Sequence, residues 1–120
     1  MINNTKVSPS KGTWHDETVQ FIGTIYQDRQ SAIIVIDDDT SEPLAKATVN
    51  FGPEEGMSRD MVYIKEYSEN HGITKALIDA KIIAPQVYHT KDTGYVSVMM
   101  YKIIDKNTLT SIDHALDRVA

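Results

Sequence analysis

Residues 61–83 read MVYIKEYSENHGITKALIDAKII, and this stretch decides the predicted fold. It begins as a strand-like run, breaks at a polar turn and continues as an amphipathic helix. The helix is predicted over residues 70–81, because apolar side chains recur there at helical spacing. Its stripe is formed by Ile73, Ala76, Leu77 and Ala80. The residues predicted to cap its free amide groups are Ser68, Glu69 and Asn70.

Four further stretches have the patterns of strands. Residues 18–26 and 43–51 alternate between apolar and polar side chains, as half-buried strands do. Residues 32–36 are almost continuously apolar and β-branched, which predicts a central strand covered on both faces. Residues 94–104 form another strand pattern, and the row that contains Tyr95 is expected to pack within the sheet. The side chains expected in one common core are Phe21, Ile34, Val49, Phe51, Ile73, Leu77 and Val98.

The two ends of the chain are predicted to be additions to a domain that spans residues 17–106. Residues 1–16 are polar, with serine, proline and glycine close together, and predict a flexible arm. Trp14, the single tryptophan, is either a packing anchor on the domain or an exposed contact for a partner. Residues 107–120 predict a second amphipathic helix. The stripe of this helix is Leu109, Ile112, Leu116 and Val119. Because so short a helix is marginal in water, the stripe must be buried, either in a homodimer or on the chain's own sheet.

Composition limits the classes of function that this chain can have. It has no cysteine, which excludes disulfides, thiolate metal sites and cysteine nucleophiles. Its formal net charge of −5 disfavours a dedicated duplex-DNA binder and suits a partner with a basic groove. No apolar run is long enough to span a bilayer, and the first residues lack the apolar segment of a signal peptide. We therefore expect a protein of the cytoplasm with no membrane partner.

An acidic run suggests a cation site, but its spacing does not fit one. The run Asp37-Asp38-Asp39 can be compared with the start of a calcium loop. Such a loop requires a glycine and a glutamate at positions that Glu42 and Thr48 occupy here. A solvated hairpin turn is the better interpretation of the run.

The four histidines do not form the i, i+4 pair of a zinc-binding helix or an HExxH motif. His71 lies at the start of the predicted helix, and His89 lies in a turn-like segment. Either could be a catalytic base only if the fold brought a carboxylate and a nucleophile to it. The sequence also contains no glycine-rich phosphate-binding motif. We therefore predict no cofactor, no metal and no catalytic residue.

Residues 63–70, YIKEYSEN, with the glycine and alanine pattern that follows, resemble the signature of a family of small uncharacterised proteins. Its members are encoded by bacteria and by their plasmids, conjugative elements and phages. The resemblance covers residues 32–104 and includes TVN at 48–50 and GYVSV at 94–98. Lys81 stands where the family tends to have the glycine that ends the helix. The resemblance implies no catalytic residues.

These observations predict an α+β protein with an antiparallel sheet of about five strands, one helix packed on a face and an added C-terminal helix. We hypothesise a non-enzymatic protein of a phage or mobile element that binds a protein partner in the bacterial host cell and blocks a defence nuclease. Two alternatives are a regulatory or nucleic-acid-associated accessory module of a replication or transfer complex and a small enzyme that uses His71 or His89. The residues nominated for partner binding are Trp14, Asp37, Asp38, Asp39, Glu66, Tyr67, Glu69, Asn70 and His71.

Overall fold

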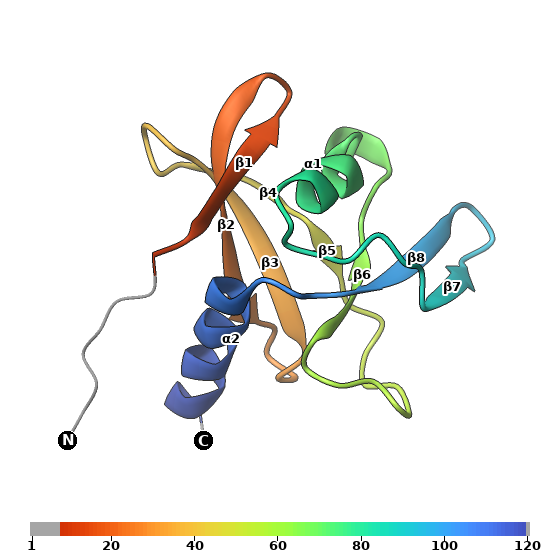
Figure 1. Cartoon of the computed structure of the whole chain (residues 1–120). Coiled ribbons are helices and arrows are strands. Elements are labelled where there is room, and N and C mark those ends of the chain that lie inside the picture. The colour runs from red at the N-terminus through yellow and green to blue at the C-terminus, as the bar shows by residue number, and fades with distance from the viewer. Residues whose placement is uncertain (1–7, 120) are drawn as a thin grey trace.

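The computed structural model describes residues 8–119, which form eight strands, one 3-10 helix and two α-helices (Figure 1). The strands are β1 (Ser10–Trp14), β2 (Glu17–Ile25), β3 (Ser31–Asp37), β4 (Pro43–Lys46), β5 (Thr48–Val49), β6 (Met61–Ile64), β7 (His89–Asp92) and β8 (Ser97–Lys102). The helices are η1 (Ser68–Asn70), α1 (Ile73–Asp79) and α2 (Lys106–Arg118).

The strands form two antiparallel sheets of four strands each, with packed helices. Sheet A has the order β1-β2-β3-β4, and sheet B has the order β5-β6-β8-β7. The predicted α+β class is therefore confirmed, although the strands are divided between two sheets where the sequence predicted one of about five.

The two sheets are connected where one extended segment passes from the first to the second. Residues 43–51 were predicted as a single strand, but β4 pairs with β3 while β5 pairs with β6. Between them lies Ala47, which is fully buried. Its N–H donates to the Ile33 carbonyl at 2.8 Å, and its carbonyl accepts the N–H of Lys65 at 2.8 Å. The alternating pattern continues unbroken through Ala47, so it gives no sign of the change of sheet.

The predicted flexible arm is wrong for Ser10–Trp14, because these residues form β1. Every residue of β1 pairs with a residue of β2, from Ser10 opposite Phe21 to Trp14 opposite Glu17. The strand was not predicted because its residues are mostly polar and show no apolar alternation. Residues 1–7 of the predicted arm lie outside the described residues.

The core has two parts. The main cluster fills the space between sheet A, sheet B and the helices, and the expected core residues Phe21, Ile73 and Leu77 lie in it. Val98 belongs to a smaller cluster on the other face of sheet B, where Val49 and Phe51 are only partly buried. Ile34 is also only partly buried, since it and Ile36 point away from the core face that carries Ile33 and Val35. The prediction that residues 32–36 are covered on both faces is therefore wrong for the outer face.

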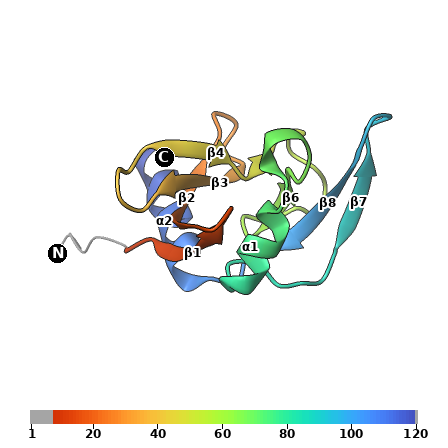
Figure 2. The same ribbon diagram turned by 90° about the horizontal axis from the view of Figure 1, so that it is seen from above.

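The helices differ from prediction at their ends and in their packing. The helix predicted over residues 70–81 is shorter, because η1 precedes it and α1 begins at Ile73. Helix α2 packs on β2, with Ile112 fully buried in the main core cluster (Figures 1 and 2). Leu109 and Leu116 pack against the same cluster, while Val119 is exposed. The stripe of α2 is thus largely covered within the chain, which removes the physical reason for a homodimer through it.

Candidate functional site

The signature tract, defined here as residues 64–72, turns the chain from β6 to α1. The prediction that Ser68, Glu69 and Asn70 cap the amides of α1 is wrong. Glu66 accepts hydrogen bonds from these amides instead. The Glu66 carboxylate accepts the N–H of Gly72 at 2.7 Å and the N–H of Thr74 at 2.9 Å. Burial acts to raise the pKa of Glu66, but these hydrogen bonds outweigh it and leave the pKa below its ordinary value.

The signature tract is also hydrogen-bonded to both edge strands of sheet A. The Asn70 side chain is 1% exposed, and its Nδ2 donates to the Lys46 carbonyl at the end of β4 at 2.6 Å. On the opposite edge, Trp14 of β1 is 8% exposed and donates from Nε1 to the His71 carbonyl at 3.0 Å. Trp14 is therefore a packing anchor, and both Trp14 and Asn70 are buried.

The other nominated residues of the signature tract lie nearer the surface. Glu69 is exposed, and hydrogen bonds from Lys65 and Ser68 lower its pKa to about 2. The His71 side chain is 88% exposed, with Nδ1 at 3.7 Å from a Glu66 carboxylate oxygen. Tyr67 is partly buried and packs against the smaller core cluster. The tract as a whole acts first as a structural connection.

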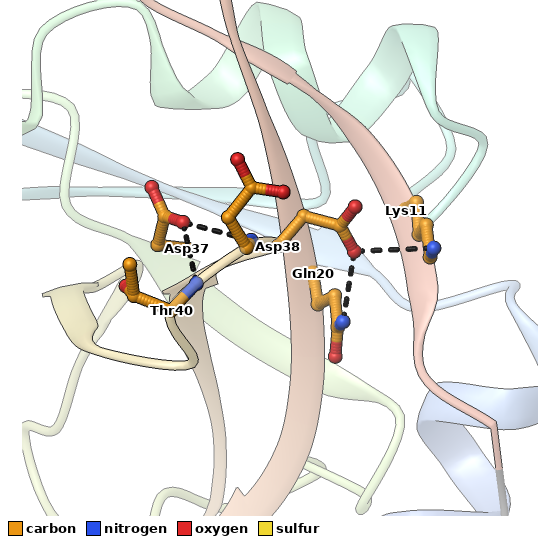
Figure 3. Close-up of polar contacts among 6 residues, drawn as sticks. Lys11, Gln20, Asp37, Asp38 and Thr40 are labelled. Carbon is orange, nitrogen blue, oxygen red and sulfur yellow. Dashed lines mark hydrogen bonds and ion pairs between the residues drawn. The ribbon is translucent and has the colours of Figure 1, made fainter.

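The acidic run begins at Asp37, the last residue of β3, and continues into the predicted turn toward β4 (Figure 3). Asp37 accepts the N–H groups of Asp39 at 2.8 Å and of Thr40 at 3.0 Å, so its carboxylate holds the turn. Asp38 accepts hydrogen bonds from Gln20 at 2.9 Å and from the Lys11 ammonium at 3.1 Å, which lower its pKa. Only Asp39 is exposed. Within residues 8–119, no group of three or more histidine and acidic side chains is placed to hold a metal ion.

The most exposed aromatic side chain lies in the turn between β7 and β8. Tyr95 is 97% exposed, and Figure 1 shows this hairpin projecting from the body of the molecule. The turn is held by several hydrogen bonds. The Thr93 N–H and hydroxyl both donate to the Val96 carbonyl, at 3.0 and 2.9 Å, and the Gly94 N–H donates to Asp92 at 2.9 Å. An ordered turn therefore presents Tyr95 to solvent.

A pocket of about 320 Å³ lies at the base of this hairpin. We call it the hairpin-base pocket, and its lining residues are Glu54, Glu55, Gly56, Met57, Met61, Tyr88, His89 and Met100. His89, which was predicted in a turn, is the first residue of β7. Its ring centroid lies 6.3 Å from that of Tyr63 on the same face of sheet B.

One wall of the hairpin-base pocket is fixed by an ion pair. The Glu54 carboxylate lies 2.5 Å from the Lys91 ammonium and accepts the Tyr63 hydroxyl at 2.5 Å. These two contacts lower the pKa of Glu54. Burial, together with the bond to Glu54, raises the pKa of Tyr63 to about 12. Lys91 also lies 5.0 Å from the centre of the Phe51 ring.

Sequence reasoning missed both Tyr95 and the hairpin-base pocket. Tyr95 was placed in a strand over residues 94–104, but β8 begins only at Ser97. The turn-forming residues Asp92 and Gly94 were the available signal. The pocket had no local signal, because its lining comes from three separate segments of the chain.

Comparison with protein-family models, with curated protein sequences and with solved structures gave no significant match. The resemblance to a mobile-element family therefore stays a prediction from the sequence, based on the residues of the signature tract and on TVN at 48–50 and GYVSV at 94–98. In the part of the chain that the structure describes, none of the helices has the length and apolar character needed to cross a bilayer.

Proposed function

We propose that this chain is a non-enzymatic binding protein of a phage or other mobile element, and that the β7–β8 hairpin is its main contact with a protein partner. One observation carries this proposal. Tyr95, with 97% of its side chain exposed, sits on a turn that is ordered by its own hydrogen bonds. Tyrosine is enriched at the energetic centres of protein interfaces, because it contributes a large contact area for little conformational entropy.

The surroundings of Tyr95 support an interface of the same kind. Val87 and Tyr88, both exposed by more than 40%, lie in the segment that leads into the hairpin. Exposed apolar side chains next to a projecting element are typical of an interaction surface. The resemblance of the signature tract supports a partner in a bacterial cytoplasm, and a host defence nuclease is one such partner.

Photo-crosslinking inside host cells tests this proposal. The photoreactive residue p-benzoylphenylalanine replaces Tyr95 in one variant and the exposed Asp39, in the β3–β4 turn, in a control variant. We expect one host or element protein to crosslink at position 95 and not at position 39. The absence of a specific crosslink at position 95, or the same protein at both positions, would contradict the proposal.

Affinity for the crosslinked protein then gives a second measurement. We expect Tyr95→Ser to weaken binding about 30-fold or more, since truncation of an interface hot spot costs about 2 kcal/mol or more. The fold should be unaffected, because the Tyr95 side chain is almost wholly in solvent. Tyr95→Phe retains the ring and should retain most of the affinity. Equal affinities for Tyr95→Ser and the native chain would remove the hairpin tip from the interface.

A further inference from the structure

The hairpin-base pocket is lined in large part by apolar, polarizable side chains. Three of the five methionines of the chain, Met57, Met61 and Met100, line it beside the half-exposed ring of Tyr88. Methionine side chains are flexible and polarizable, so they adapt their shape to an inserted group. The face of a tyrosine ring attracts cations, and Tyr88 is exposed enough to be reached by one.

The charge on the pocket is negative and only partly neutralised. The charge of Glu54 is neutralised, because its carboxylate is paired with Lys91 and accepts the Tyr63 hydroxyl. Glu55 is exposed, and none of the ion pairs among residues 8–119 involves it. A carboxylate without a counter-ion next to apolar walls favours a group that is cationic at one end and apolar along its stem.

We infer that the hairpin-base pocket receives an arginine side chain of the same protein that contacts Tyr95. The guanidinium is planar and weakly hydrated, stacks on an aromatic face and binds a carboxylate with two parallel hydrogen bonds. A lysine ammonium is more strongly hydrated and fits a Met- and Tyr-lined surface less well. This inference rests on the proposed function, because it names the chemistry that the partner brings to the hairpin.

Methyl NMR of methionine provides the test, because the chain carries its own reporters and an internal control. Met57, Met61 and Met100 line the pocket. Met99 lies on the opposite face of β8, since successive residues of a strand point to opposite sides. The full-length protein, labelled on its methionine methyl groups, is titrated with n-butylguanidinium, which carries the head and stem of arginine. Parallel titrations use n-butylammonium and pentan-1-ol.

We expect saturable shifts of the three pocket methyl groups with n-butylguanidinium, and little shift of Met99. Binding of n-butylammonium should be weaker, and pentan-1-ol weaker still. Glu55→Gln should weaken binding of n-butylguanidinium about two- to fivefold, as expected for a partly exposed ion pair. The matched variant Glu17→Gln removes an exposed carboxylate from β2 and should leave the affinity unchanged.

Three results would overturn the inference. The first is the absence of saturable shifts at the pocket methionines with any cation. The second is binding that is as strong for pentan-1-ol, or that is insensitive to Glu55→Gln, since the pocket would then be apolar only. The third is tighter binding of n-butylammonium than of n-butylguanidinium, since the pocket would then prefer a lysine side chain to an arginine. A specific crosslink at position 95 without binding in the NMR titration would contradict this inference but leave the proposed function standing. The failure of the inference can therefore be told apart from the failure of the proposed function.

Discussion

Lys81 ends helix α1 in the left-handed conformation, with φ of 61°. The helix end has the two hydrogen bonds of a Schellman motif, from the Ile82 N–H to the Leu77 carbonyl at 2.9 Å and from the Lys81 N–H to the Ile78 carbonyl at 3.0 Å. An L-residue with a β-carbon is strained in this conformation, whereas glycine is not. A lysine at this position therefore carries a cost in backbone strain that a glycine would not carry.

We expect Lys81→Gly to raise the free energy of unfolding by up to about 1 kcal/mol, because the relief of left-handed strain outweighs the extra entropy of glycine in the unfolded chain. Urea unfolding of the two proteins measures the difference. Lys81→Ala keeps the β-carbon and should show no such gain. A glycine variant less stable than the native chain would mean that the lysine side chain itself contributes to the helix end.

Asn70 makes the most buried polar contact of the signature tract, and its replacement tests whether the tract is structural. We expect Asn70→Ala to lower the free energy of unfolding by about 1–3 kcal/mol, since it leaves the Lys46 carbonyl without its buried donor. Glu69→Gln, at an exposed position of the same tract, should change it by less than about 0.5 kcal/mol. If Asn70→Ala unfolds at the same urea concentration as the native chain, the tract does not hold sheet A.

Helix α2 can pack closely on β2 because Gly23, at the contact between them, has no side chain. A β-carbon at Gly23 would lie 2.3 Å from the Thr108 carbonyl oxygen and 2.9 Å from Cγ1 of Ile112. The Ser111 hydroxyl also donates to the Gly23 carbonyl at 2.7 Å. The helix and the strand therefore approach more closely than any other residue at this position would permit.

We expect Gly23→Ala to lower the free energy of unfolding by about 1–3 kcal/mol, because the added methyl group forces α2 away from β2. Thr24→Ala is the matched control, since the neighbouring residue points to the other face of sheet A and should cost well under 1 kcal/mol. Chemical unfolding followed by circular dichroism compares the two. An alanine variant as stable as the native chain would show that α2 is not held against β2 at Gly23.

The elements that the sequence predicted best are those whose packing follows a local period. The strands β2 and β3 and the helix α2 lie within a few residues of their predicted bounds, because each buries one regular row of side chains. The strand β1 was missed because its stability comes from backbone pairing with β2 and from one buried apolar side chain, Trp14, in a polar segment. Pairing of this kind leaves no periodic signal.

At the scale of the whole molecule, the candidate site could not be predicted because it is assembled from distant segments. The signature tract attracted attention in the sequence, but its buried contacts with both edges of sheet A give it a structural role. The surface proposed for binding depends on where β8 begins and on which loop covers the outer face of sheet B. Both are properties of the assembled fold.

The packing of α2 on β2 affects how the chain folds during translation. Ser10 at the start of β1 donates to Asp105 at the cap of α2, across 95 positions of the sequence. Until Ile112 has left the ribosome, the apolar face of sheet A has no cover from α2 on the nascent chain. Folding must then wait for long-range contacts, which slows it and leaves apolar surface exposed in the meantime. The nascent chain therefore keeps part of its apolar surface exposed for longer than a fold built from local contacts would.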